Sequence, residues 1–379
     1  MSTLADAQSV QPAASSTFEP GLSFGPVLRF KAFDDFSVGL ELRGTTVYGE
    51  RVVTTLAAGP NPEGQLASAG LRYEQPFFDL SFGEDATLSL VARSSFAQSY
   101  PLQLEPDPPG SALETRTFTE RLNELEVGLA QPFGEIEVGV EGRIVGAEAV
   151  LERRDAPEGL EPGEGRELLP SDSLSAVVEV SALYEGVAEN TPAPPSGGAA
   201  SVGVGYGLGL SDASLSWVQV QVGGRGYLAL GDLLGVQKTD EGTPSVVLAS
   251  RMNAGANVGR APAWRRFAPV LRGYDAFDLV GARYIDLSLD LRYYTGLDAA
   301  LGGPSYLRGV TPYAFVDAGN AWGGEGASYR APGIGEGIQV GFGAGLQLDL
   351  ETQYFRLPLN LWYARGAKGK VGFALEYPY

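Results

Sequence analysis

The amino-acid sequence predicts an all-β fold: a transmembrane antiparallel β-barrel of about 16 strands, with 14 as the nearest alternative. Three observations support this prediction. Apolar and polar residues alternate with a period of two along most of the chain. Many alternating segments run for about 10–14 residues, which suits a tilted strand crossing a bilayer better than a strand of a soluble sheet. One face of these segments is aliphatic and aromatic, whereas the other is rich in Gly, Ser, Gln and charges of both signs.

The composition excludes several classes of function. The 379 residues include 52 Gly, no His and no Cys. The missing residue types exclude Ser-His-Asp and Cys-His catalysis, thiolate zinc and disulfides. We therefore expect no enzyme activity, no metal and no other cofactor. The formal net charge of −19 gives the chain no electrostatic reason to bind nucleic acid, so we expect no nucleic-acid partner.

The chain divides into a short leader and one long region of strands. Residues 1–20 have no basic start and no apolar core of a signal peptide, and they predict a flexible leader. Residues 21–379 predict one barrel domain, with about fifteen strand candidates and a sixteenth expected before residue 20 or upstream. The clearest candidates are 36–48, 86–98, 124–129, 136–144, 174–182, 202–210, 284–293, 338–350 and 371–379.

A soluble β-sandwich also alternates, but its strands are shorter and its inner face carries large packed residues. In hydrocarbon every backbone polar group must be paired, so an all-β membrane protein closes into a barrel. Aromatic residues at segment ends predict interfacial girdles at Tyr48, Tyr100, Tyr184, Tyr293, Tyr294, Trp322 and Tyr377. The alternation predicts a lipid face at Leu287, Leu289, Val340, Phe342, Leu346 and Phe373. It predicts a lumen face at Asp286, Asp290, Arg292, Gln339, Gln347 and Asp349.

Two patterns resemble catalytic or phosphate-binding motifs only superficially. The alternate glycines at 203–209 lie in a strand, whereas a phosphate-binding loop needs a turn that opens a helix. They predict a smooth stripe in the lumen, or a place where another part of the chain packs close to the wall. Neighbouring carboxylates, such as Glu124/Glu126 and Glu137/Glu141, share a face with arginines. This pattern favours a network of mixed charge in the lumen over acid–base chemistry.

Two short motifs between residues 264 and 322 are the most informative. Leu271-Arg272-Gly273-Tyr274 lies in a long loop, and a later strand carries Phe315, Asp317 and Gly319 on its lumen side. A buried acid opposite a loop arginine suits a charge-assisted, often bidentate, contact between loop and wall. The spacing leaves an alternative open, in which the arginine is solvated and the acid pairs with another cation of the lumen.

Over roughly 264–379 the order of these motifs resembles the C-terminal barrel of BamA-like proteins, of the bacterial surface antigen type. These are outer-membrane assembly and translocation barrels. The resemblance extends through a glycine-rich strand, two closing strands and a terminal aromatic residue. It implies a sixteen-stranded barrel whose long extracellular loop folds into the lumen. It also implies a loop-to-lumen lock, in which the loop arginine meets the strand aspartate, formed by Leu271, Arg272, Gly273, Tyr274, Phe315, Asp317 and Gly319.

The resemblance implies an integral protein of the bacterial outer membrane that inserts or translocates polypeptides. In such barrels the first and last strands meet at a lateral seam, where an open edge can template an incoming strand. The expected partners are outer-membrane lipid and the barrel-assembly machinery during biogenesis, with client polypeptides or periplasmic partners as further candidates. The last strand resembles the signal that this machinery reads, formed by Phe373, Leu375, Tyr377 and Tyr379.

A second function stays open at this point. Family members that insert or translocate polypeptides normally carry POTRA domains ahead of the barrel. Residues 1–20 lack the alternating helices and strands of such a domain, so we expect a POTRA-less chain. The alternative is therefore a passive channel, or a structural outer-membrane barrel that anchors a separate soluble domain.

Overall fold

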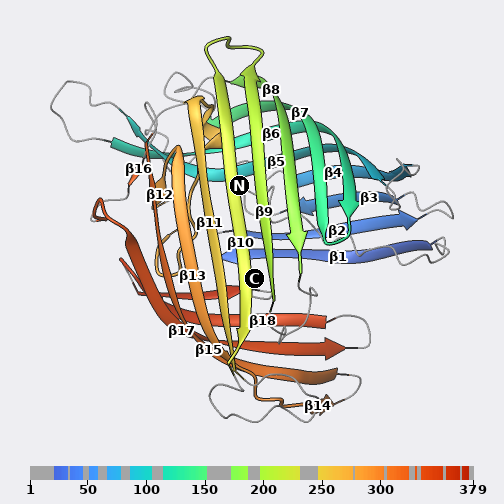
Figure 1. Cartoon of the computed structure of the whole chain (residues 1–379), viewed down its shortest axis with the longest axis vertical. Helices are drawn as coiled ribbons and strands as arrows, with labels where there is room; N and C mark the ends of the chain where they lie inside the picture. Colours follow the sequence, from blue (N-terminus) through green and yellow to red (C-terminus); the bar gives the residue numbers. More distant parts are fainter. Residues whose placement is uncertain are drawn as a thin grey trace, which may run out of the picture.

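The computed structural model is built from strands that follow one another around a single curved sheet (Figure 1). It describes residues 21–32, 35–45, 51–58, 66–77, 86–104, 114–151, 172–186, 197–230, 246–275, 278–302, 305–323, 329–330, 334–352, 356–367 and 369–374. Within these ranges, the regular structure other than strands is one short 3₁₀ turn, η3, at Ala263–Arg265. No helix among the described residues is long and apolar enough to cross a membrane.

Sixteen strands form the wall, and each pairs with the next in an antiparallel ladder. They are β1 (Gly21–Ala32), β2 (Asp35–Thr45), β3 (Arg51–Ala58), β4 (Leu66–Phe77), β5 (Ala86–Leu104), β6 (Glu114–Phe133), β7 (Ile136–Leu151), β8 (Ser173–Glu185), β9 (Gly197–Gly209), β10 (Ser216–Ala229), β11 (Val246–Arg260), β13 (Arg283–Tyr293), β15 (Ser305–Trp322), β17 (Gln339–Thr352), β18 (Arg356–Arg365) and β19 (Gly369–Ala374). The predicted strand number of about 16 is confirmed. All sixteen described strands lie after residue 20, so this number is reached without the strand that was expected before residue 20 or upstream.

Three short strands complete the structure. β14 (Ala299–Gly302) follows β13 and pairs with the start of β15. β12 (Leu279–Val280) and β16 (Tyr329–Arg330) form a separate two-stranded sheet. The large sheet curls round until β1 lies beside β19, which brings the first and last strands of the wall together (Figure 1). One curved sheet replaces the two packed sheets of a sandwich.

The two faces of the wall differ as the alternation predicts. On β13, Leu287 and Leu289 are 38% and 39% exposed, whereas Asp286 and Asp290 are 4% and 0% exposed. On β17 the outward side chains include Val340 and Phe342, with Leu346 half-buried. The predicted lumen residues Arg292, Gln347 and Asp349 are buried, and Gln339 is half-buried at the end of its strand. The wall therefore carries its apolar side chains outside and its polar side chains inside.

Some predicted positions behave differently or lie outside the described residues. Tyr184, Tyr293 and Trp322 are exposed on the outer face, as girdle residues would be. Tyr294 is 5% exposed and packs inward with Tyr227, so its girdle assignment is wrong. It follows Tyr293 directly, and alternation turns the next side chain to the lumen. The side chains of Tyr100 and Phe373 are not described, and outside the described residues lie Tyr48, Leu375, Tyr377, Tyr379 and the leader 1–20.

The loop between β11 and β13, residues 261–282, folds into the barrel. Its large apolar side chains are buried, among them Trp264, Phe267 and Leu271. The backbones of Phe267 and Gly281 exchange two hydrogen bonds of 2.9 Å, which closes the loop on itself near its base. The rings of Phe267 and Tyr284 stack with centroids 4.6 Å apart. The loop thus has a small core of its own against the inner wall.

Candidate functional site

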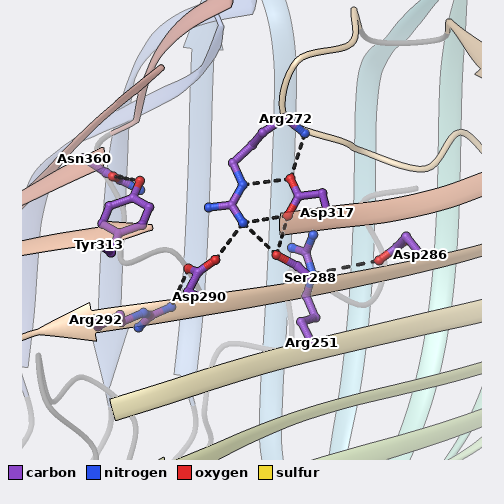
Figure 2. Close-up of polar contacts among 9 residues, drawn as sticks. All are labelled: Arg251, Arg272, Asp286, Ser288, Asp290, Arg292, Tyr313, Asp317 and Asn360. Carbon is purple, nitrogen blue, oxygen red and sulfur yellow. Dashed lines mark hydrogen bonds and ion pairs between the residues drawn. The ribbon is translucent and has the colours of Figure 1, made fainter. Parts of the chain in front are cut away.

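Arg272 reaches from the inward loop to Asp317 in the middle of β15 (Figure 2). The guanidinium donates from Nε to Asp317 Oδ2 at 2.8 Å and from Nη2 to Oδ1 at 2.6 Å. The backbone N–H of Arg272 donates to the same Oδ2 at 2.9 Å. This is the bidentate geometry that a guanidinium and a carboxylate favour, with a backbone bond added. The two residues of the predicted lock are therefore brought together, and the loop backbone is held as well as its side chain.

The neighbouring strand β13 supplies two further partners. Arg272 Nη2 lies 2.7 Å from both Ser288 Oγ and Asp290 Oδ1 (Figure 2). The Ser288 hydroxyl donates to Asp317 Oδ1 at 2.6 Å, and Asp290 also accepts from Arg292 at 3.2 Å. Asp317, Ser288 and Asp290 are 2%, 1% and 0% exposed. Burial weakens screening by water, so these charges depend strongly on one another.

The remaining residues of the two motifs shape the space around Arg272. The guanidinium carbon lies 3.6 Å from the centre of the Phe315 ring, a cation–π contact. A Cβ at Gly319 would lie 2.7 Å from the carbonyl oxygen of Ile285 and 3.0 Å from a methyl carbon of Leu271. Gly319 therefore has to be glycine if Leu271 is to pack there. Leu271 itself is 4% exposed in the core of the loop.

Gly273 and Tyr274 attach the loop to the last strands. Gly273 has φ of +91°, and a Cβ there would lie 2.7 Å from the backbone nitrogen of Gly366. Both the left-handed conformation and the close approach require glycine. The Tyr274 hydroxyl donates to the carbonyl of Val340 at 3.1 Å, and Lys370 Nζ on β19 donates to Asp275 Oδ1 at 2.9 Å. The end of the motif thus contacts β17, the β18–β19 turn and β19.

Other polar side chains of the lumen pair among themselves. Asp286 accepts from Asn253 at 2.9 Å and lies 3.9 Å from Arg251, so it is not part of the lock (Figure 2). The Tyr313 hydroxyl donates to Asn360 Oδ1 at 2.6 Å. Gln339 donates to the carbonyls of the loop before β17, away from Arg272. The predicted lumen residues are therefore divided among several separate contacts.

Carboxylates of β6, β7 and β8 pair with arginines of the same face, across strands or within one strand. Ion pairs join Arg93 to Glu124 and Arg143 to Glu179, and Arg143 also lies 3.7 Å from Glu141. Each of these three carboxylates therefore faces a guanidinium. The arrangement is the mixed-charge network that the alternation predicts.

Sequence reasoning missed several residues that contact the loop. Ser288 shares the lumen face of β13 with Asp286 and Asp290, but its place opposite Asp317 depends on the register between β13 and β15. Gly341 sits beneath the carbonyl oxygen of Arg272, which a Cβ would meet at a distance that no real contact allows. The glycine-rich character of 338–350 was the available signal for this close approach.

Replacing Gly341 with alanine should displace Arg272 from the wall. Overpacking of this kind costs roughly 1–3 kcal/mol, and here the collision is with a backbone atom that cannot rotate away. We expect faster amide hydrogen exchange at Arg272 and Tyr274 in Gly341→Ala. Gly142→Ala on β7 is the matched control, because a Cβ there meets nothing within 4 Å. Equal exchange in the two variants would show that the close approach of Gly341 to the Arg272 carbonyl does not hold the loop in place.

Solved structures show where this fold has been seen. BamA from Haemophilus ducreyi lacking POTRA domains 1–3 superposes with a TM-score of 0.60 at 13% identity, over 94% of this chain and 69% of that one. CdiB from Acinetobacter baumannii gives a TM-score of 0.51 at 12% identity, over 93% of this chain and 58% of that one. CdiB from Escherichia coli gives a TM-score of 0.51 at 12% identity, over 94% of this chain and 60% of that one.

The chain thus spans about three-fifths of the length of both CdiB proteins. No protein-family model matches the sequence, and no curated protein matches it. At this level of sequence identity, the comparison shows a shared fold and nothing further. The resemblance drawn from the two motifs is confirmed at that level: the chain has the fold of the BamA and CdiB outer-membrane barrels.

Proposed function

We propose that this chain is an integral barrel of the bacterial outer membrane that inserts or translocates polypeptides. In this proposal the inward loop holds the lumen closed through Arg272 and Asp317, and the wall opens sideways between β1 and β19. The observation that carries the proposal is the buried, bidentate contact of Arg272 with Asp317, on a barrel with the fold of BamA and CdiB.

The loop in the lumen contacts a strand at the seam between β1 and β19, and this contact supports the proposal. Lys370 lies on β19, the last strand of the wall, and donates to Asp275 three residues after Arg272. β19 lies beside β1, so the contacts of the loop extend to the strand that would move when the seam opens. An unpaired strand edge exposed in this way could pair with an incoming strand.

The proposal is tested by following a urea-unfolded outer-membrane barrel as it folds into lipid vesicles. Vesicles carrying this protein should speed that folding relative to protein-free vesicles. Because the chain has no cysteine, introduced thiols are unique. A disulfide between Val371→Cys on β19 and a cysteine scanned along β1 should abolish the acceleration, and reduction should restore it.

A disulfide between Val202→Cys and Val222→Cys is the matched control. These residues face each other across β9 and β10, and both are exposed on the outer face, far along the chain from the seam. Its oxidation should leave the acceleration unchanged. If the uncross-linked protein does not speed folding and instead gives a steady conductance across a planar bilayer, the passive channel is the better account.

A further inference from the structure

The inward loop carries a second pair of large side chains, well before Arg272. Trp264 and Arg265 lie in η3, and each is 7% exposed. The Trp264 ring meets the Trp217 ring of β10 edge to face, with centroids 6.1 Å apart and planes at 88°. Val145 and Ala147 of β7 and Val177 of β8 complete this cluster of buried residues. The first part of the loop is therefore packed against a different part of the wall from the lock.

The sequence of β9 is adapted to this packing. A Cβ at Gly207 would collide with the indole of Trp217, which stands opposite it on β10. Gly207 thus makes room for Trp217, and Trp217 forms the surface on which Trp264 rests. A glycine inside a strand often marks such a close approach, and Gly207 is the position on β9 where it occurs.

Arg265 adds a polar contact to the same attachment. Its Nη2 lies 3.5 Å from Glu179 Oε2 on β8, and the Asn257 amide donates to its carbonyl oxygen at 2.6 Å. Burial, with the nearby charge of Arg143, lowers the pKa of Arg265 to about 10. The guanidinium therefore stays protonated at neutral pH. Burying this charge costs desolvation free energy, which is offset mainly by the attraction of Glu179.

The two attachments differ in what is left behind when they open. Glu179 also pairs with Arg143 of the wall, so it keeps a cation when Arg265 leaves. Among the described residues, the ion-pair partner of Asp317 is Arg272 alone. Opening the lock leaves a buried carboxylate without a cation, whereas opening the contact at Arg265 does not. The contact at Arg265 is therefore the easier one to open.

We propose that Trp264 and Arg265 form a second attachment of the loop to β7, β8 and β10, which opens while the lock at Arg272 stays closed. Phe267 marks the division, because it is bonded to Gly281 and stacked on Tyr284 in the part held by the lock. Release of residues 261–266 would clear the lumen beside β7–β10 and leave Arg272 in place. This partly open state of the loop does not depend on what the barrel transports.

Amide hydrogen exchange of the full chain in vesicles or detergent tests the proposal. In Arg265→Gln, exchange of residues 263–266 should rise roughly tenfold, while residues 272–274 stay within about twofold of the wild type. In Arg272→Gln, residues 272–274 should become fast and residues 263–266 should stay slow. Arg265→Lys keeps the charge and should give a smaller increase, and it serves if Arg265→Gln does not fold.

Arg260→Gln is the matched control, because Arg260 is an exposed arginine at the end of β11 that donates to Ser214 at 2.8 Å. It should leave both segments at their wild-type exchange rates. Unchanged exchange of residues 263–266 in both Arg265 variants overturns the proposal. So does a parallel rise in both segments in Arg265→Gln, because the loop would then open as one unit.

Discussion

Replacing Asp317 with asparagine should loosen the inward loop and leave the barrel wall folded. The change keeps the shape of the side chain but removes the charge that two Arg272 nitrogens and the Arg272 amide contact. Removing one partner of a buried charge pair costs roughly 2–5 kcal/mol, mostly as the penalty on the charge that remains. Part of this cost is relieved here, because Asp290 still accepts from Arg272.

The loss is measured as the local free energy of opening, from hydrogen exchange of residues 270–275. Asp298→Asn is the matched control: Asp298 pairs with Arg308 at 2.9 Å but is 57% exposed, so its loss should cost less than about 1 kcal/mol. The charge swap Arg272→Asp with Asp317→Arg should recover little of the lost stability. The guanidinium and the backbone N–H of residue 272 both reach Asp317 from the loop, and a swapped pair cannot reproduce this arrangement. Unchanged exchange in Asp317→Asn would show that the loop is held by its apolar contacts alone.

Placing an arginine on the outer face of β10 should be far more harmful than placing one a single residue away. Val222 is 38% exposed on the outer face, near the middle of the strand. Gln221 is half-buried on the lumen side, beside Gly203. If the outer face meets lipid, Val222→Arg should lower the free energy of unfolding by roughly 2–4 kcal/mol, the cost of a cation near the bilayer midplane.

Gln221→Arg should change that free energy by less than about 1 kcal/mol, because its head can reach the carboxylates of the lumen. The measurement is urea unfolding of the protein in lipid vesicles, followed by the heat-dependent mobility of the folded barrel on a gel. The two variants differ only in the face that receives the charge. Equal losses would argue against a lipid-facing outer surface and so against the proposed location.

Alternation along single strands was enough to predict the faces of the wall, because the period of two is a local property of the backbone. Leu287 and Asp286 lie on opposite faces as expected. The contact between Arg272 and Asp317 could be predicted for a different reason, because its two motifs resemble those of a known barrel family. Composition and spacing alone left the pairing of Arg272 with Asp317 as one of two alternatives.

Contacts that depend on register or on loop conformation could not be predicted. Ser288 faces Asp317 only because β13 and β15 pair in one particular register, across a connection that includes the extra strand β14. Trp264 and Trp217 are brought together by the path of a loop without strand periodicity. Lys370 meets Asp275 across 95 positions of sequence. Such pairs follow from the three-dimensional course of the curved wall and its loop, and no local pattern encodes them.

The docking site of the loop also constrains the order in which the chain can fold. Arg272 precedes all of its wall partners in the chain: Ser288 and Asp290 on β13, and Asp317 on β15, with Gly341 of β17 beneath its backbone. Contacts of such long sequence separation form late, because the intervening chain must first be ordered. The loop therefore has no place to dock until the strands after it have paired. Docking of Arg272 therefore requires that β13, β15 and β17 have come together, so the same contact can serve as a checkpoint of assembly.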